Sequence, residues 1–476
     1  MSRRRSSLAA LAAALGTLAV PEAASAHGLG GRADVPIPTW LLAWAAAVVL
    51  IVSFIALATL WRTPKLEGDA SFRPLPWWLG MAIVNPVIEI AAGAIGVGLL
   101  FLTIWAGLAG TESPQANFTP TFVFVIFWVG LVPASLLFGD LYRAFNPWRA
   151  IGRAAGFTTA RILGELPRPF RYPEWLGRWP AILPILCFTW MELIYLDGQL
   201  PSRIAVAAMV YSAYTLVAMA AFGTDTWLRV GEGFSVYFNF FSRISPLCVR
   251  DGRLGLRPPL AGLTTLDVIP GTVGFIVVAI GTVTFDGASE GSRWAAAAAS
   301  VQDFFHSIGF GLVASIELAG TVGMAVAIGL IAAIYSTGIA GVRSVDHRPF
   351  VQSARSFAHT LVPIAAAYVL AHYVSFLVFN GQAMAYLASD PLGRGSDLFG
   401  TAGSSIDYSI LSATAIWYVQ VAVLVIGHVF GLVLAHDRAL AMYDDVRVAT
   451  RSQYWMLAVM VGFTTFGLWL LSQANS

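Results

Sequence analysis

The chain has 476 residues, of which 57% are hydrophobic and only 11% are charged, and its mean hydropathy is +0.72. So few charges exclude a soluble globular protein of this length and predict an all-α fold, a polytopic helical bundle in a membrane. The net charge is +2, and no basic face with interleaved aromatic residues is present, which excludes nucleic acid as a partner. The lipid bilayer is the expected partner.

The N-terminus has the pattern of a signal peptide. Arginines at its start are followed by the apolar run from Leu8 to Val20 and by the small-residue pattern Ala24-Ser25-Ala26. We expect cleavage after Ala26, which divides the chain into a signal peptide, 1–26, and a polytopic transmembrane domain, 27–476. The new terminus, His27, would offer its free amine and its ring nitrogen to one metal ion. Two alternatives remain open, namely a His27 that only begins an exported segment and a first helix that stays uncleaved.

Apolar runs long enough to cross the ~30 Å hydrocarbon core of a bilayer, which takes about 20 residues, recur along the rest of the chain. The sequence predicts ten spans after the signal peptide: 39–61, 88–110, 119–139, 179–197, 204–223, 267–284, 317–340, 357–380, 409–435 and 454–472.

The loops between these spans alternate in their content of Lys and Arg. Loop 140–178 contains seven arginines and loop 224–266 contains five, whereas loop 111–118 contains none. The excess of positive charge on the cytoplasmic side of membrane proteins therefore places the basic loops inside and the mature N-terminus outside. The basic loops are 62–78, 140–178, 224–266, 341–356 and 436–453, and the poor ones are 111–118, 198–203, 285–316 and 381–408.

Three stretches interrupt the simple pattern of spans. Pro86 and Glu89 at the start of the second span predict a kink or a half-inserted segment within 77–93. Residues 294–316 are apolar and are expected in the outer interface, and residues 226–246 are expected to form an inner interfacial helix. Segments 138–148 and 222–246 are weakly similar in sequence, since each begins with Phe-Gly followed closely by Asp. This similarity is explained either by duplication or by an aromatic-rich composition.

Four histidines lie in or next to the eighth and ninth spans: His359, His372, His428 and His436. His359 and His372 are thirteen residues apart, which is the spacing on helices that hold two haems. His428 and His436, however, are only eight residues apart, and on an ideal helix the side chains of His359 and His372 would point in directions about 140° apart. Both facts argue against haem. A transition metal such as zinc or copper, shared by His372 and His428 and completed by Tyr368, is the second interpretation. The third is that these histidines only satisfy one another or backbone groups between helices.

Ionisable groups near the predicted outer ends of the spans form a second candidate set. His306 and Glu317 would share a face on one continuous helix, and Glu192 lies at the end of the fourth span. Together with an exported His27 they would suit zinc or copper, whereas the alternative is that Glu192 and Glu317 are boundary carboxylates that face lipid headgroups. The candidate catalytic residues are thus Glu192, Glu317 and Tyr368, and the candidate metal ligands are His27, His306, His359, His372, His428 and His436.

Several known catalytic motifs are missing from the sequence. It has no Walker loop, no HExxH and no GxSxG, so nucleotide-driven transport, zincin chemistry and serine hydrolysis have no support. Its two cysteines, Cys187 and Cys248, are not expected to pair.

Several stretches resemble a bacterial family of multi-pass membrane proteins known as fenitrothion hydrolases, which cleave organophosphates. They are AHGLGGRADVPIPTWLLAW, FGDLYRAFNPWRA, FNFFSRISP, AHYVSFLVFNGQ and GHVFGLVLAHDRA, and they extend from residue 26 to about residue 439. The resemblance implies hydrolysis of a phosphotriester in the bacterial plasma (inner) membrane, for which a metal-activated water is the usual device.

Two classes of function follow from these observations. One is a metal-dependent hydrolase that acts on a lipophilic small molecule. The other is a protein that handles metal ions such as copper or zinc, or a small-solute permease, in which intramembrane histidines carry metal or protons. A permease pathway predicts polar residues through the whole depth of several helices, whereas here they concentrate at two levels.

Overall fold

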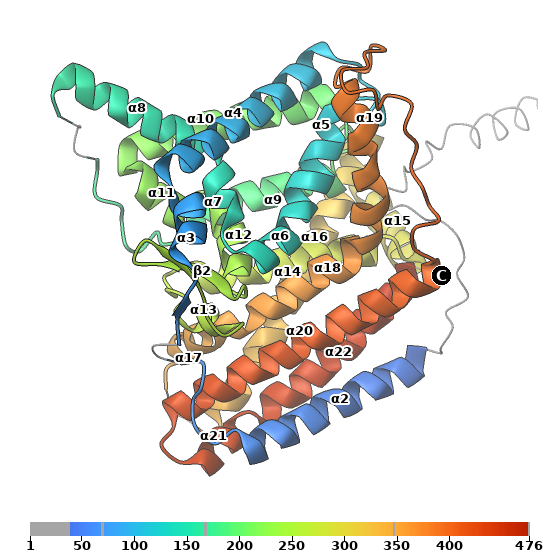
Figure 1. Cartoon of the computed structure of the whole chain (residues 1–476). Helices are drawn as coiled ribbons and strands as arrows, with labels where there is room; N and C mark the ends of the chain where they lie inside the picture. Colours follow the sequence, from blue (N-terminus) through green and yellow to red (C-terminus); the bar gives the residue numbers. More distant parts are fainter. Residues whose placement is uncertain (1–38, 68–70, 166–168, 346–347, 475–476) are drawn as a thin grey trace, which may run out of the picture.

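The protein is an all-α polytopic helical bundle with one small sheet (Figure 1). The computed structural model describes residues 39–67, 71–165, 169–345 and 348–474. Within these ranges, nine helical segments are long and apolar enough to cross a membrane. They are α2 (Thr39–Leu60), α4 (Pro86–Ala109), α5–η1–α6 (Phe118–Phe138), α10 (Pro201–Phe222), α14 (Thr272–Ser289), α16 (Leu312–Arg343), α17–η2–α18–η3–α19 (Phe350–Ser389), α20 (Ala413–Met442) and α21–α22 (Val446–Ala474).

Several of these segments are composite. The third combines α5 (Phe118–Pro120), the π-helix η1 (Thr121–Gly130) and α6 (Leu131–Phe138). The eighth combines α17 (Phe350–Phe357), η2 (Ala358–Thr360), α18 (Leu361–Asn380), η3 (Gly381–Ala383) and α19 (Met384–Ser389), and the last combines α21 (Val446–Ser452) and α22 (Tyr454–Ala474). The remaining elements are α3 (Trp77–Val84), α7 (Leu141–Phe145), α8 (Pro147–Leu163), α11 (Thr224–Val230), α12 (Gly233–Ser242), α13 (Ala261–Thr264) and α15 (Ser292–Ser307), with strands β1 (Arg73–Pro74), β2 (Leu247–Arg250) and β3 (Arg253–Leu256).

The fourth predicted span, 179–197, corresponds to a shorter helix, α9 (Trp179–Leu193). Its 15 residues extend only about 22 Å at ~1.5 Å per residue, less than the ~30 Å of a hydrocarbon core. Its two ends nevertheless lie at opposite ends of the bundle. Arg178 N–H donates to Pro270 O in the basic loop before α14, and Ser202 N–H, after α9, donates to Glu112 in an arginine-poor loop.

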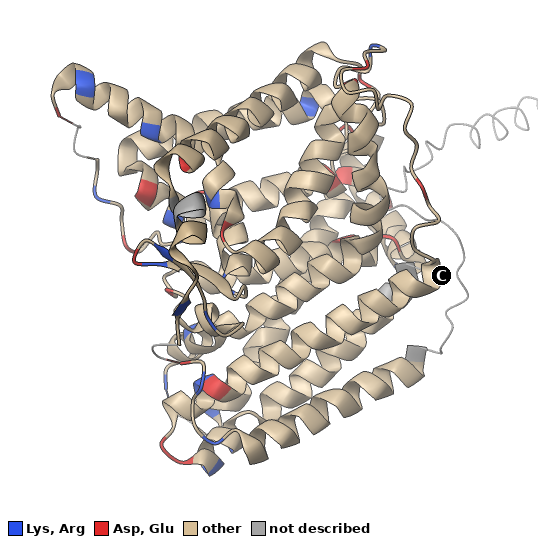
Figure 2. Cartoon of the chain, in the orientation of Figure 1, with Lys and Arg blue, Asp and Glu red and all other residues tan. Residues whose placement is uncertain are grey.

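The loops sort into the two groups that their charges predict. At the basic end, β1 and β2 both pair antiparallel with β3 in the order β1-β3-β2, which joins loop 62–76 to the loop after α12. At the other end, Thr111 N–H donates to Leu392 O at 2.9 Å and Leu196 N–H donates to Glu317 at 3.4 Å. Lys and Arg accordingly gather at the left side of the view in Figure 2. The grouping of the loops is therefore confirmed, and which end faces the cytoplasm stays a prediction.

Labelling of single cysteines would test that orientation. We expect that Cys187 and Cys248, both of which are free, can be replaced, and that cysteines can then be introduced at Ala154 on α8 and at Ser396 in loop 390–412. An impermeant thiol reagent added to intact cells should label position 396 and not position 154, because loops rich in arginine stay inside. Labelling of both positions after the cells are opened is the control. The orientation would be reversed if position 154 alone reacted in intact cells.

The three predicted interruptions have different outcomes. The kink near Pro86 is confirmed, because the chain breaks at Asn85 between α3 and α4 and the Asn85 side chain caps α4 through Val87 N–H at 2.8 Å. The prediction of an inner interfacial helix is wrong, because α12 is buried in the bundle, where its aromatic side chains such as Phe238 and Tyr237 lie. Residues 294–316 belong to α15 and the start of α16, which are separated at Gly309, with φ 103°, and their place in the outer interface stays a prediction.

Helix α14 is the centre of the bundle. Most of its side chains are buried, from Thr272 to Gly287, and it contacts α9, α16, α18 and α22. Close packing requires glycine at one position, because a Cβ on Gly281 would lie 2.7 Å from the Cα of Ile328 on α16. The side chains at the end of α14 are therefore held among several other helices.

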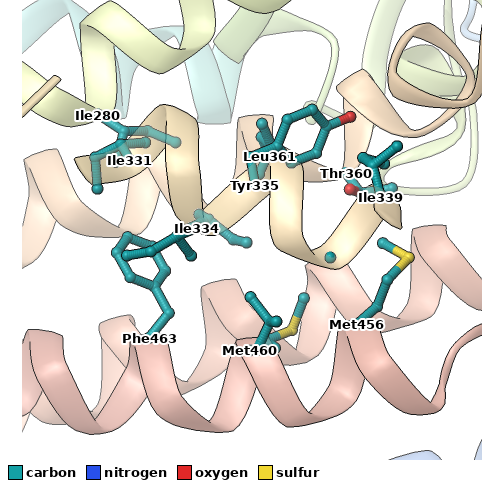
Figure 3. Close-up of a pocket in the computed structure, with 13 residues that line it drawn as sticks. Ile280, Ile331, Ile334, Tyr335, Ile339, Thr360, Leu361, Met456, Met460 and Phe463 are labelled. Carbon is teal, nitrogen blue, oxygen red and sulfur yellow. The ribbon is translucent and has the colours of Figure 1, made fainter. Parts of the chain in front are cut away.

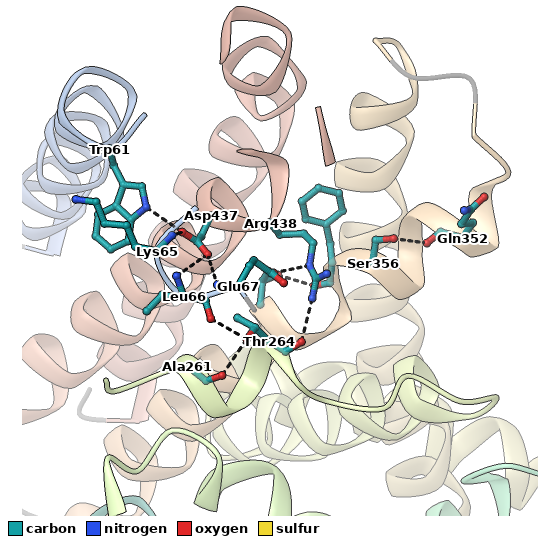
Figure 4. A network of polar contacts seen from close by, with 12 residues as sticks. Trp61, Lys65, Leu66, Glu67, Ala261, Thr264, Gln352, Ser356, Asp437 and Arg438 are labelled. Carbon is teal, nitrogen blue, oxygen red and sulfur yellow. Dashed lines mark hydrogen bonds and ion pairs between the residues drawn. The ribbon is translucent and has the colours of Figure 1, made fainter. Parts of the chain in front are cut away.

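Two buried carboxylates organise the basic end. Asp437 on α20 accepts hydrogen bonds from Trp61 Nε1 and from the backbone N–H groups of Lys65, Leu66 and Glu67, at 2.6–3.0 Å (Figure 4). These contacts fix the chain after α2 against α20. Beside them, Arg438 forms an ion pair with Glu67 at 2.9 Å. Burial raises the pKa of Glu67, and the Arg438 guanidinium opposes that rise.

Glu232, the N-cap of α12, is the other buried carboxylate. It accepts hydrogen bonds from the backbone N–H groups of Phe234 and Ser235, from Asn146 Nδ2 and from the Tyr211 hydroxyl. Asn146 belongs to the first of the two similar segments, 138–148, and Glu232 to the second, 222–246. The two segments therefore pack against each other, which neither requires nor excludes duplication.

Candidate metal centre

Asp286, Glu290 and His372 bring three potential metal ligands together. Asp286 lies in the last turn of α14, and Glu290 follows one turn later at the C-cap, so both carboxylates are on one side of the helix. His372 comes from α18, which packs against α14. One ligand atom from each residue lies within 4.8 Å of the others, and this is the one such group of three or more among the described residues.

The geometry fits a divalent cation after a small adjustment. His372 Nε2 lies 2.9 Å from Asp286 Oδ2, and the two atoms would move apart to the ~3.4 Å that separates tetrahedral ligands with bonds of about 2.1 Å. Glu290 is exposed, whereas Asp286 is buried. Two carboxylates at the C-terminus of a helix also face the negative end of its dipole, and a bound cation would relieve this repulsion.

A buried tyrosine and a third carboxylate adjoin this group. The Tyr373 hydroxyl donates to Asp286 Oδ2 at 2.5 Å and thereby fixes the orientation of that carboxylate. Glu192, at the end of α9, lies close enough to the hydroxyls of Tyr373 and Tyr237 to interact with them electrostatically. Glu192, which the sequence suggested as a catalytic residue, is thus near Tyr373, which contacts Asp286.

Tyr368 and His372 lie one turn apart on α18 and line the same small cavity of about 20 Å³. The Tyr368 hydroxyl is 3.5 Å from Phe463 O, and its ring stacks on that of Phe463. His372 Nδ1 faces α14, where a Cβ added at Gly287 would lie 3.6 Å from it. The structure therefore places one candidate catalytic residue next to one candidate ligand.

The structure does not bring His428 into the same group. Its ring is fully buried on α20, and Nδ1 lies 2.7 Å from Leu424 O, one turn earlier in the same helix. Its other nitrogen, Nε2, has no hydrogen-bond partner among the described residues. The ring lies beside those of Tyr368 and Phe463, with centroids 6.1 and 5.8 Å away. His372 finds its partner on α14 instead of α20.

His359 and His436 lie at the basic end of the bundle, far along their helices from His372. His359 is buried in η2. His436 is buried on α20, with Nδ1 3.2 Å from Gln453 Oε1 and Nε2 2.9 Å from Trp61 O. Both ring nitrogens of His436 are thus satisfied by helix-to-helix contacts, as the packing interpretation predicts. Asp437 accepts from Trp61 and the backbone, as described above, and not from its neighbour His436.

The remaining candidates are dispersed. His306 is exposed on α15 with Nδ1 3.0 Å from Phe310 O, and Glu317 on α16 accepts from Leu196 N–H. These two do not share a continuous helix, because the chain breaks at Gly309 between α15 and α16. His27 lies outside the described residues, so its role as a terminal ligand stays a prediction.

Asp286 and Glu290 were not singled out from the sequence. The predicted sixth span ended at residue 284, and a carboxylate just beyond the end of a span is ordinary in a membrane protein. One signal was present: the two acids stand four apart directly after an apolar run, which places them on one face if the helix continues.

Comparison with known proteins gives no match: no family model, no curated protein and no solved structure is similar to this chain.

Proposed function

We propose that this protein is a metal-dependent hydrolase of the membrane that cleaves a lipophilic phosphotriester at Asp286, Glu290 and His372. The observation that carries the proposal is the convergence of these three ligand types on one point at the end of two packed helices. Two carboxylates and one imidazole suit zinc, and three protein ligands leave a coordination position for water. The resemblance described above supplies the reaction class.

Each group has a role in this proposal. A bound zinc ion would lower the pKa of its water and supply a hydroxide near neutral pH. Tyr373 holds the Asp286 carboxylate in place through its 2.5 Å hydrogen bond. Tyr368, on the wall of the adjacent cavity, is positioned to face the substrate. We further propose that the site faces the outside of a bacterial plasma membrane, since it lies at the end where the loops are poor in arginine.

The second candidate is a metal-handling protein or a small-solute permease. The pair of His372 and Asp286, 2.9 Å apart, favours it, because an ionisable pair among membrane-spanning helices is typical of ion and proton pathways. A pathway would continue through the bundle from this pair. The larger cavity between α18 and α22 is instead lined by apolar side chains apart from Thr360 and Tyr335, which favours the hydrolase.

Metal analysis of the purified protein tests the proposal. We expect about one zinc per chain in the wild type, and loss of that zinc in Asp286→Asn and His372→Ala, because each change removes one of three ligands. Hydrolysis of diethyl p-nitrophenyl phosphate should decrease by about 100-fold or more in both variants. His428→Ala is the matched control, since that buried histidine lies on a neighbouring helix outside the ligand group, and it should retain the metal.

Two results would overturn the proposal. One is a wild-type protein that binds no zinc, copper or manganese, even after incubation with each. The other is a metal content that is unchanged in Asp286→Asn. A protein that binds zinc through Asp286 and His372 but hydrolyses no ester would instead support the second candidate.

A further inference from the structure

A cavity of about 50 Å³ lies between α14, α16, α18 and α22 (Figure 3). Its walls are apolar apart from the side chains of Thr360 and Tyr335, and two flexible methionines, Met456 and Met460, form the α22 side. Ile334 on α16 and Val459 on α22 are only half-buried. The cavity therefore approaches the outer surface of the bundle between α16 and α22, where lipid chains would lie.

A second, smaller cavity lies along three of the same helices, α14, α18 and α22. It is the cavity of about 20 Å³ that His372 and Tyr368 line, and it is bounded by α14, α18, α20 and α22. On α18 the lining residues advance in steps of three or four, from Leu361 and Ile364 to Tyr368 and His372. This is the spacing of one helix face. The two cavities thus follow one another along α18. The distance along this helix from Thr360 to His372 is about 18 Å at ~1.5 Å per residue.

Two stacked rings separate the cavities. The rings of Tyr368 and Phe463 are 5.2 Å apart and nearly parallel, at 14°. The Tyr368 hydroxyl has a long hydrogen bond of 3.5 Å to Phe463 O, and His428 Nε2 beside this pair has no partner among the residues that the structure describes. The side chains of Tyr368 and Phe463 therefore form the barrier between the cavities. The two cavities would be joined if the rings of Tyr368 and Phe463 moved apart.

We propose that these two cavities form one binding site for the apolar part of the substrate, which enters from the lipid between α16 and α22 and reaches the metal centre at His372. The inference rests on the proposed function and adds the route and the pocket. The cavities as they stand have room for only a few water molecules, since about 10–15 Å³ of such volume holds one. Binding therefore requires Tyr368 and Phe463 to separate.

A substitution that fills the first cavity but lies away from the metal centre tests the proposal. A Cβ on Gly338 of α16 would lie 3.9 Å from Met456 and 4.0 Å from Val459, so Gly338→Leu fits the helix and extends into the cavity. Gly329→Leu is the matched control, because it makes the same change on the same helix where nothing lies within 4 Å of the added Cβ. Neither glycine is near the metal centre.

We expect Gly338→Leu to raise the KM for dioctyl p-nitrophenyl phosphate about tenfold or more and to leave the hydrolysis of the diethyl ester within about twofold, because only the long chains need the first cavity. Gly329→Leu should change neither, and both variants should keep the zinc of the wild type. An equal effect of Gly338→Leu on both esters, or no effect on either, would overturn the proposed route.

Photolabelling separates this inference from the proposed function. A dialkyl phosphotriester with a diazirine at the end of one chain should label Met456 or Met460 in the wild type and in Gly329→Leu, and not in Gly338→Leu. Hydrolysis is not needed for this result, so labelling of an inactive protein would support the binding site while the proposed reaction failed. A wild type without label on α22 would overturn the binding site.

Discussion

Asp437→Asn is expected to lower the free energy of unfolding by about 3 to 5 kcal/mol, because it breaks a set of four hydrogen bonds to a buried carboxylate. Asp437 is fully buried, and its two oxygens accept one indole and three backbone N–H groups. Asparagine has the same shape but only one acceptor oxygen. Its amide N–H₂ would face two backbone N–H donors, which would then be buried without a partner.

Thermal unfolding of the purified protein in detergent, followed by the fluorescence of its tryptophans, measures this loss. Asp444→Asn is the control: this residue is exposed in the turn after α20, so its substitution should stay within about 0.5 kcal/mol. Limited trypsin digestion gives a local readout, since release of the Lys65 backbone should speed cleavage after that residue. Unchanged stability together with unchanged digestion at Lys65 would show that the four contacts contribute little.

Most of the fold was predictable from the sequence. Nine of the ten predicted spans correspond to long apolar helices among the described residues, and the remaining one, 179–197, corresponds to α9. Hydrophobic length and the alternation of arginines suffice for this, since both follow from the cost of placing backbone and charge in lipid. The burial of α12 was not predictable. Its aromatic residues fit either a headgroup layer or an interior, and only contacts with distant helices decide between them.

One of the three ligands of the candidate metal centre, His372, was predictable. His372 stood out because a histidine inside an apolar run needs a partner. Its neighbour along the chain, α20, was the natural place to look for one, which led to His428. The partner is Asp286 on α14, 86 residues earlier, and one sequence contains no information about which of the other helices packs against α18. The same limit applies to Asp437, whose backbone donors come from the other end of the chain.

Glu232→Gln is expected to destabilise the protein by about 3 to 5 kcal/mol as well, and Glu232→Ala by more. Glu232 is fully buried, and each of its oxygens accepts two hydrogen bonds: Phe234 N–H and the Tyr211 hydroxyl on Oε1, Ser235 N–H and Asn146 Nδ2 on Oε2. Burial raises the pKa of Glu232, and these hydrogen bonds oppose the rise. The four donated hydrogen bonds favour the ionised form of the carboxyl group, whereas burial favours the neutral form.

Glutamine would turn an N–H₂ group toward one pair of these donors, and α12 would also lose the negative charge at its N-terminus. Alanine would leave all four donors without their acceptor. Because Glu232 joins α10, α12 and the turn before α8, the loss should affect the cooperative unfolding of the whole bundle and not one loop alone. Glu174→Gln, at a carboxylate whose side chain is 85% exposed and pairs only with Arg171, is the control and should have little effect.

A double-mutant cycle decides whether the hydrogen bonds are the cause. Tyr211→Phe removes one donor from Glu232, so the stability losses of Tyr211→Phe and Glu232→Gln should not add, with a coupling of about 1 kcal/mol or more. Both single variants and the double variant are measured by thermal unfolding in the same detergent. Additive losses would mean that Tyr211 and Glu232 stabilise the protein independently. A Glu232→Gln variant as stable as the wild type would show that the folded protein holds this carboxyl group protonated, with its charge already absent.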